Sequence, residues 1–321
     1  MNKIKLLALP LVISILLVFV PLSKAHAATS PDLGNADGFA VIAGTTITAT
    51  GTSVITGNVG LEPGAGSAIE PTCTEVDGTI YDRDGNYVGD GDQSCRVTNA
   101  SLLGLAKTDL GTAYDNLSLG DNATCTVTYP GTQDLVGLTL VPGVYCADAF
   151  ALSGTLTLSG TGVWVFRSAA TLVTSGTANI VGGNACSIWW KVVSSATLGT
   201  NTSLKGNILA LTSITMATGA TLEGQALARN GAVTLDSNTI TKSTCTATLR
   251  NPDSSAASED SNTFNEDTRC LATTPLVPQW ASRSSANGGV NLLWSAVGGS
   301  KVDIEITNNK GEYEYKYVKV P

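Results

Sequence analysis

The chain has few charged residues and almost no histidine. Only 14% of its 321 residues are charged, aromatic residues make up 6%, and the single histidine is His26. That histidine lies in a segment that we expect to be cleaved, so the mature chain would lack an imidazole for a Ser–His pair, a Cys–His pair or a metal site. This absence excludes a large group of hydrolases and zinc enzymes.

The first residues predict an export signal. Two lysines precede an apolar run over 6–22, and Ala25 and Ala27 stand where signal peptidase prefers small residues. A retained membrane anchor is the alternative, but the run contains a proline and is barely long enough to cross a bilayer. Removing residues 1–27 removes three lysines and no acid, which changes the formal net charge from −8 to −11. We therefore expect a secreted protein, free or attached to the cell surface, that binds neither nucleic acid nor, after cleavage, a membrane.

Seven cysteines are present, but none forms a CxxC motif. In an exported chain, this spacing predicts disulfides rather than metal or redox chemistry. Cys73–Cys95 and Cys125–Cys146 are the local pairings, and Cys186–Cys245 would join the two ends of a repetitive region. One cysteine would then be left over.

That repetitive region has a period of 18 residues. "ATLGTNTSLKGNILALTS" (196–213) aligns with "ITMATGATLEGQALARNG" (214–231), a third round begins at "VTLDSNTI", and weaker echoes lie at 47–59, 154–167 and 170–184. Short strands and glycine corners at such a period are typical of a β-solenoid. An ordinary sandwich of hairpins is the alternative, but it predicts turns about every 8–12 residues without an aligned repeat.

Several segments depart from the repeat within a main domain that we assign to 28–245. Apolar residues at spacings of three and four predict an amphipathic helix over 99–117, which would cover one side of the solenoid. The polar insertion 71–97 is bracketed by cysteines and predicts a cap over one end. Residues 246–275 have the composition of a disordered linker. Residues 276–321 are predicted to form a partial β-sandwich-like tail, in which 289–320 alternate as three strands.

The aligned coils share a column of small hydroxyl-bearing residues. Stacked strands would place equivalent residues about 4.7 Å apart, and residues two along a strand about 6.6–6.8 Å apart. Threonine as an ordinary strand residue is the alternative, but a surface selected only for solubility would carry lysine and glutamate, which are missing here. A flat, uncharged grid of hydroxyls and methyls can bind a regular lattice such as ice through many weak contacts.

The ordered strings "GFAVIAGTTITATG", "ACSIWWKV" and "GATLEGQALARNGAVTLDSNTIT", which lie between Leu33 and Cys245, resemble the secreted microbial ice-binding family. The resemblance implies a right-handed, discontinuous parallel β-solenoid of triangular cross-section, with one long helix alongside and the N-terminal coil packed beside later coils. It also implies that one flat face binds the surface of an ice crystal. Carried over to this sequence, that face would comprise Thr50, Ser53, Thr174, Thr177, Thr200, Thr202, Ser203, Thr218, Thr221 and Thr239.

We therefore predict a mainly β, monomeric, non-enzymatic ice-binding protein that inhibits ice growth or recrystallisation and needs no cofactor. An adhesion module that binds polysaccharide or protein through the same face or the tail is the alternative. A carbohydrate-active solenoid enzyme would need paired carboxylates, but Glu223 and Asp236, the only acids between 150 and 245, are 13 residues apart. The tryptophans Trp164, Trp189 and Trp190 predict core positions rather than a sugar platform.

The string "DRDGNYVGDGD" alternates oxygen-bearing side chains as a calcium loop does. Its glycine is not at the position that an EF-hand requires, so a solvated acidic loop is favoured over a metal site. The weak calcium candidates are Asp82, Asp84, Asn86 and Asp90.

Overall fold

The computed structural model describes residues 27–244 and, in the C-terminal part, the strands between 277 and 319. The expected export signal and linker therefore lie outside the described residues. The chain divides into two units, Met1–Thr248 and Leu249–Pro321, and each is described by itself. No helix among the described residues is long and apolar enough to cross a membrane.

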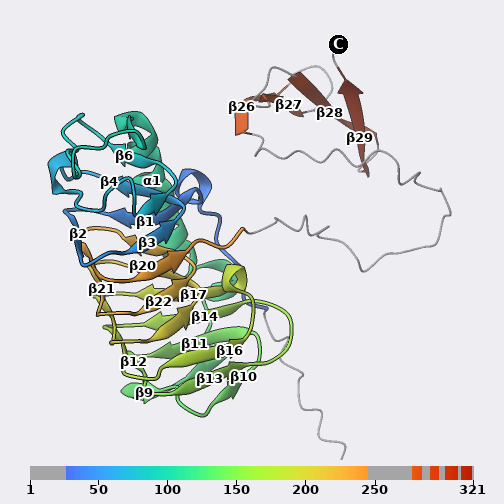
Figure 1. Ribbon diagram of the computed structural model, residues 1–321. Helices are drawn as coiled ribbons and strands as arrows, with labels where there is room; N and C mark the ends of the chain where they lie inside the picture. Colours follow the sequence, from blue (N-terminus) through green and yellow to red (C-terminus); the bar gives the residue numbers. More distant parts are fainter. Residues whose placement is uncertain (1–26, 245–276, 284–289, 296–300, 310–311, 320–321) are drawn as a thin grey trace, which may run out of the picture. The chain divides into compact units, whose positions relative to one another are not determined.

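The first unit is a stack of coils, in which successive turns of the chain add strands to three parallel sheets, here called sheets A, B and C (Figure 1). In spatial order, sheet A contains β7 (Arg96–Thr98), β6 (Ile80–Asp82), β4 (Asn58–Leu61), β1 (Phe39–Ala43), β23 (Ala226–Ala228), β20 (Asn207–Ala210), β17 (Ile188–Val192), β14 (Trp164–Ser168), β11 (Gly143–Ala147) and β8 (Val127–Thr128). Sheet B contains β2 (Ile47–Thr50), β24 (Val233–Asp236), β21 (Ile214–Met216), β18 (Ala196–Leu198), β15 (Leu172–Thr174), β12 (Ala149–Leu152) and β9 (Thr132–Asp134). Sheet C contains β10 (Thr139–Leu140), β13 (Thr155–Leu158), β16 (Asn179–Gly182), β19 (Ser203–Lys205), β22 (Thr221–Glu223), β25 (Thr239–Thr241), β3 (Val54–Thr56) and β5 (Val76–Asp77).

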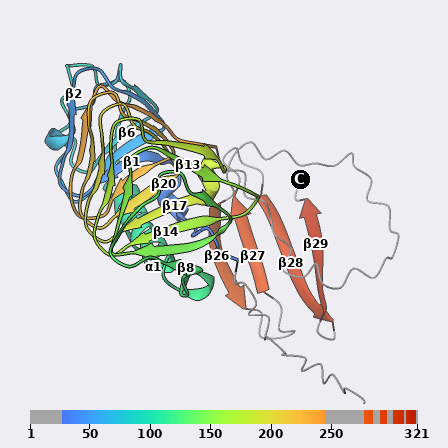
Figure 2. The ribbon, with the colours of Figure 1, turned by 90° about the horizontal axis from the view of Figure 1, so that it is seen from below.

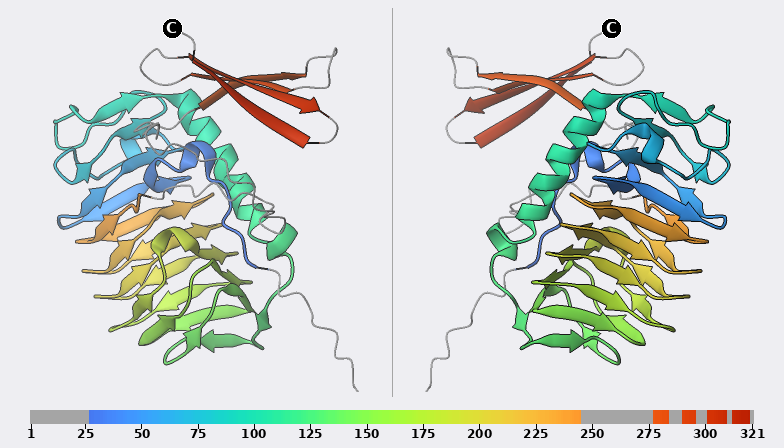
Figure 3. Two further views of the ribbon diagram at one scale, coloured as in Figure 1. Left: turned by 90° about the vertical axis from the view of Figure 1, so that its right-hand side faces the viewer. Right: turned by 90° about the vertical axis from the view of Figure 1, so that its left-hand side faces the viewer.

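The order of the coils in space differs from their order in the chain. The first coil, β1 to β3, pairs with the last one, so that β1 lies beside β23, β2 beside β24 and β3 beside β25. After β7, helix α1 (Ala100–Asn116) carries the chain along the stack to its opposite end, where β8 begins the remaining coils (Figures 1 and 3). This arrangement confirms the discontinuous, three-sided parallel solenoid. Figure 2 views the same unit after a quarter turn, with the coils lying behind one another.

Successive side chains on the strands of sheet A point alternately into and out of the solenoid, and apolar residues occupy both faces of the sheet. In β14, Trp164 and Phe166 point into the solenoid, whereas Val165 points outward. Equivalent inward residues stack from coil to coil, and the rings of Phe166 and Trp190 lie 4.2 Å apart between centroids. Such stacks contribute beyond the area that they bury, and they hold neighbouring coils in register.

Helix α1 covers the outward layer of sheet A. It begins after Asn99, whose side chain accepts a hydrogen bond from the main-chain N–H of Leu102, as an N-cap does. Its buried stripe includes Leu103, Leu110 and Tyr114 and packs against sheet A residues such as Val165. The predicted helix and its predicted partner are both confirmed.

Residues 62–98 continue the stack at the end occupied by the N-terminal coil. Strands β5, β6 and β7 each add to a sheet edge, and the disulfide Cys73–Cys95 closes the segment. A second disulfide joins Cys125 and Cys146, so both local pairings are confirmed. Cys186 is also disulfide-bonded, whereas the suggested partner Cys245 lies outside the described residues.

The second unit is an antiparallel four-stranded sheet. Its strands are β26 (Val277–Arg283), β27 (Val290–Ser295), β28 (Lys301–Asn309) and β29 (Glu312–Lys319), paired in sequence order. The sequence pattern suggested three strands, and the structure adds a fourth at the N-terminal side.

Candidate functional site

The outer face of sheet B carries a column of threonines in exact coil-to-coil register. Thr48 pairs with Thr234, Thr234 with Thr215, and Thr215 with Thr197. Val173 continues the column beyond Thr197. The side chains of Thr197, Thr215 and Val173 are exposed and the other two are half-buried. Since neighbouring strands lie about 4.7–4.9 Å apart, Thr234, Thr215 and Thr197 present a hydroxyl and a methyl at a regular spacing. The hydroxyl of Thr48 is buried and has no hydrogen-bond partner among the described residues.

This face is almost free of charge. Asp134 lies at one end, and at the other the carboxylate of Glu70 accepts a hydrogen bond from the main-chain N–H of Ala49. Burial acts to raise the pKa of Asp134, but hydrogen bonds from Ser153 and from the main-chain N–H of Val136 outweigh it and lower the pKa. Between these ends the outer residues are Thr, Ser, Ala and Val, with only Asp236 at the border.

A second column follows the corner between sheets B and C. Thr200, Thr218, Asp236 and Thr50 occupy it in spatial order, and the hydroxyl of Thr218 donates to the carboxylate of Asp236. The next residue of each coil is left-handed, with φ of 58° at Asn201, 71° at Gly219 and 52° at Ser237. This conformation turns the chain sharply, so the residue before it points outward and the residue after it points inward in these three coils. In the first coil Gly51 is left-handed, Thr52 after it is exposed, and Ser53 is the residue that points inward.

The first outer column of sheet C adds three more hydroxyls. Ser203 pairs with Thr221 and Thr221 pairs with Thr239, so all three side chains leave the same face. Two residues further along these strands, Lys205 and Glu223 form an ion pair with a distance of 3.5 Å between Nζ and Oε2. The uncharged surface therefore includes only the first outer column of sheet C and ends before Lys205 and Glu223.

Three of the predicted face residues point inward, and for these the prediction is wrong. Ser53 and Thr202 are fully buried because they follow the corner, at the position where Asn238 also turns inward. Thr174 is only 2% exposed because it stands two residues after the inward Leu172. Thr174 and Thr202 share a hydrogen bond of 2.7 Å between their hydroxyls, and the Oγ of Ser53 accepts one from the main-chain N–H of Asn238.

The remaining predicted residues lie on the surface along the corner and the adjoining edge of sheet C. Thr177 is displaced from the regular grid, because Asn179 is the partner of Ser203 and Thr177 therefore corresponds to Asn201 in the turn. Thr221 is half-buried, and the exposed ones are Thr50, Thr177, Thr200, Ser203, Thr218 and Thr239.

The threonine column itself was not among the predicted residues. A strict period of 18 aligns Thr215 with Val233, whereas the structure pairs Thr215 with Thr234 because the loop before β24 is one residue longer. The available signal was the alternation within each strand. In β18 and β21 a threonine stands between two buried apolar residues, which predicts that it points outward.

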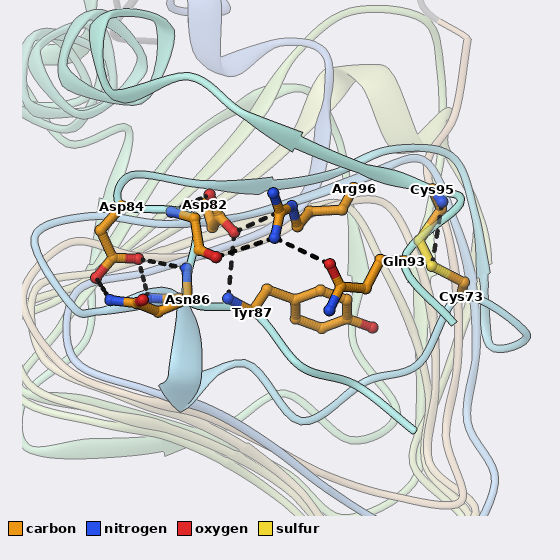
Figure 4. Close-up of polar contacts among 10 residues, drawn as sticks. Cys73, Asp82, Asp84, Asn86, Tyr87, Gln93, Cys95 and Arg96 are labelled. Atoms are coloured by element: carbon orange, nitrogen blue, oxygen red, sulfur yellow. Dashed lines mark hydrogen bonds and ion pairs between the residues drawn. A yellow bond between two sulfur atoms is a disulfide. The ribbon is translucent and has the colours of Figure 1, made fainter. Parts of the chain in front are cut away.

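The three aspartates among the calcium candidates bind main-chain N–H groups, and the side-chain amide of Asn86 donates to Asp84 (Figure 4). Buried Asp82 accepts hydrogen bonds from Gly85 and Tyr87 and lies 3.7 Å from the Nε of Arg96. Asp84 accepts from Gly66 and Asn86, and the hydrogen bond from Gly66 is the main cause of its lowered pKa. In residues 27–244 and the C-terminal strands, no group of three or more His, Cys, Asp or Glu side chains is placed to hold a metal ion. Asp90, the fourth candidate, is exposed and accepts from Asp92.

The features considered for carbohydrate chemistry have structural roles. Trp164 and Trp190 belong to the inner core, and Trp189 lies beneath the helix on the outer side of sheet A. Glu223 pairs with Lys205 on sheet C, whereas Asp236 binds Thr218 at the corner. The two acids therefore have different partners on different parts of the surface.

The geometry defines a discontinuous β-solenoid with one helix-covered side and one bare, threonine-rich side. Comparison with known proteins agrees: residues 41–241 match the family described as Ice-binding-like. The chain is 40% identical over 249 residues to an ice-binding protein of Nostoc sp. (strain HG1), covering 73% of this chain and 84% of the relative. An ice-binding protein of Flavobacterium frigoris (strain PS1) is 38% identical over 216 residues, covering 65% and 75%.

A solved structure has the same architecture. The ice-binding protein of the Antarctic ascomycete Antarctomyces psychrotrophicus superposes with a TM-score of 0.58 at 34% identity, covering 68% of this chain and all of that one. The chain belongs to the Ice-binding-like family. Neither the relatives nor the described residues support the adhesion alternative.

Proposed function

We propose that the chain adsorbs to ice through the outer face of sheet B and the adjoining corner, and so inhibits ice growth or recrystallisation. The observation that carries this proposal is the register Thr48–Thr234–Thr215–Thr197 on an uncharged face of a chain that belongs to this family. We infer an extracellular, monomeric, non-enzymatic protein whose partner is the ice crystal surface.

The physical basis is the addition of many weak contacts. A threonine hydroxyl can hold an ordered water nearly as well as a direct hydrogen bond, while its methyl reduces the freedom of neighbouring water. Each contact is weak, but all contacts of one rigid face form in the same binding event. The entropy of association is therefore lost only once, and the free energies of the contacts add up. Charged side chains would hold water in other orientations, and they are absent from the centre of this face.

The test is Thr215→Tyr, which places a bulky ring in the middle of the threonine column. Thr215 is exposed, so the fold should be unaffected, whereas the ring holds the face away from a flat lattice. We expect the concentration needed to inhibit recrystallisation to rise at least tenfold, which corresponds to about 1.4 kcal/mol. Thr112→Tyr on the solvent side of helix α1 is the matched control and should retain full activity.

A parallel Thr218→Tyr variant separates the corner from the sheet. If both variants lose activity, the face spans both columns. If Thr215→Tyr remains fully active while Thr218→Tyr is inactive, the corner rather than sheet B binds ice. Full activity in both variants would remove this surface from consideration.

A further inference from the structure

A separate hollow lies at the edge of sheet A, beyond the end of helix α1. Its volume is about 350 Å³, and it is lined by residues of β8, β11, β14 and β17 together with Ser118 and the first residues of the loops toward sheet B. The disulfide Cys125–Cys146 forms part of its wall and holds β11 to the segment before β8. This hollow is not part of the threonine-bearing surface.

Two cations lie side by side in the hollow. Arg167 of β14 and Lys191 of β17 are direct partners in the parallel register, and both leave the outer face of sheet A. Like charges at opposite positions of neighbouring strands destabilise a sheet. The pair is also unexpected in a chain whose net charge is −8.

Neither cation forms an ion pair with a carboxylate in the described part of the chain. The ion pairs there use other cations, namely Arg83, Arg96, Lys205, Arg229 and Lys242. Burial, followed by the charge of Arg167, lowers the pKa of Lys191 to about 8, so Lys191 is still mainly protonated at neutral pH. Two positive charges therefore share one hollow without a direct ion pair, although the charge of Asp115 acts on Lys191 and Asp148 also lines the hollow.

Both charged groups are held in fixed positions. The Nη1 of Arg167 donates to the carbonyls of Asn122 and Ala123 at 2.9 and 3.1 Å. The Nζ of Lys191 donates to the Oγ of Ser118 at 2.7 Å and lies 4.3 Å from the ring centroid of Tyr114. The Nε and Nη2 groups of Arg167 make no hydrogen bond to any described residue. A fixed guanidinium with free N–H groups is suited to binding a carboxylate.

An acidic residue and an aromatic residue also line the hollow. Asp148 is exposed there and forms no ion pair with either cation, so its oxygens can accept hydrogen bonds from a ligand. Tyr129, which is half-buried and packs against the inner core, also lines the hollow. Asp148 would repel a simple dianion, but it would favour a ligand that carries hydroxyl groups next to a single carboxylate.

We propose that this hollow binds a small hydroxy-carboxylate such as a free sugar acid, with its carboxylate on Arg167 and Lys191 and a hydroxyl on Asp148. The carboxylate of the ligand gives the two cations the direct ion pair that they lack, and a hydroxyl of the ligand uses Asp148 as an acceptor. A long polyanion fits less well, because the rest of the acidic chain repels it. The proposal does not depend on ice binding, since the two surfaces share no residue.

The test is isothermal titration of the full chain with sodium glucuronate at constant ionic strength. We expect saturable binding of one glucuronate per chain, with affinity at least tenfold higher than for glucose, which lacks the carboxylate, and for acetate, which lacks the hydroxyls. Arg167→Gln should weaken glucuronate binding at least tenfold, and Arg167→Lys, which keeps the charge, should weaken it less. Lys205→Gln on sheet C should have no effect.

Asp148→Asn provides a second test that does not disturb buried contacts, because Asp148 is exposed. It should reduce the preference for glucuronate over acetate. Thr215→Tyr should bind glucuronate as well as the native chain does, which separates this site from the ice-binding proposal. Absence of glucuronate binding, equal binding of glucose, or unchanged affinity in both Arg167→Gln and Asp148→Asn would overturn the proposal.

Discussion

Sheets A and B are built by the same coils, yet their outer faces have opposite properties. On sheet A the outward residues of successive strands include Val165, Trp189 and Leu209, and helix α1 buries them. On sheet B the equivalent outward positions hold Thr197 and Thr215, and no described element covers them. The inward residues of both sheets belong to one core. The comparison shows that the core determines the spacing of a solenoid, while the outward residues decide whether a side packs against the chain or stays free for a ligand.

Leu110→Ala should have the largest effect, because it weakens the cover of sheet A. Leu110 is 1% exposed, and deletion of a buried leucine side chain costs about 2–5 kcal/mol. The free energy of unfolding, measured by denaturant titration, should fall by this amount while inhibition of recrystallisation per folded molecule remains unchanged. Leu105→Ala on the same helix is the control, since Leu105 is 51% exposed and its loss should change stability by less than about 0.5 kcal/mol. Equal effects of the two substitutions would contradict the assignment of the helix as a cover.

Substitutions on the uncovered face of sheet B should reduce inhibition of recrystallisation and leave stability unchanged. Thr197→Val combined with Thr215→Val keeps two methyls and removes two hydroxyls from the threonine column. Stability should change by less than about 0.5 kcal/mol. The inhibitory concentration should rise roughly 5- to 150-fold, because the two hydroxyl hydrogen bonds contribute about 0.5–1.5 kcal/mol each, or about 1–3 kcal/mol together. Thr108→Val with Thr112→Val on helix α1 is the control for unrelated threonines. An unchanged inhibitory concentration would mean that the methyl groups alone carry the interaction.

Much of the solenoid could be predicted from the sequence, because its core repeats. The period of 18 residues and the apolar stripe over 99–117 are local patterns, and both gave correct elements. The register between the first and last coils has no local signal: the hydroxyl of Thr50 donates to the carbonyl of Leu235, 185 residues away. Only the resemblance to a known family suggested that the N-terminal coil packs beside later coils.

The candidate face was predicted less well, because the orientation of a side chain depends on single-residue differences between coils. Thr202 and Thr218 both belong to hydroxyl-rich corners, but Thr202 follows the left-handed residue and is buried, whereas Thr218 precedes one and is exposed. One extra residue before β24 shifts the repeat and conceals the match of Thr215 to Thr234. A repeat predicts which residues are equivalent, but the turn geometry decides which of them are accessible.

A partly buried lysine of helix α1, on the covered side of sheet A, should make stability depend on pH. Lys107 is a residue of helix α1 whose Nζ donates to the carbonyl of Arg229, and burial, aided by the charge of Arg229, lowers its pKa to about 8. The unfolded chain keeps this proton up to about pH 10.5, so it binds more protons than the folded chain between pH 8 and 10.5 and stability rises with pH there.

Between pH 7 and 9.5, we expect the free energy of unfolding to increase by about 1 kcal/mol from Lys107, after allowing for its partial exposure. Lys107→Met should reduce the rise, which urea titrations at the two pH values can measure. Above pH 10 the trend should reverse, since burial raises the pKa of Tyr87 to about 12 and the folded chain then holds the extra proton. Equal stability of the native chain at pH 7 and 9.5 would contradict the lowered pKa of Lys107 in the folded chain.

Ser237→Gly should have the smallest effect, and it acts at the corner where the bare face ends. Ser237 has a φ of 52°, a conformation that costs a residue with a Cβ roughly 1–2 kcal/mol, and the equivalent coil has Gly219 at this position. Glycine would relieve this strain, but its greater freedom in the unfolded chain offsets about 0.5–1 kcal/mol of the stabilisation. We expect the free energy of unfolding to increase by about 0.5 kcal/mol, measured by thermal or urea unfolding. Ser175→Gly, at a corner position without positive φ, should instead lower stability, and a loss in both variants would mean that the left-handed turn stores no strain.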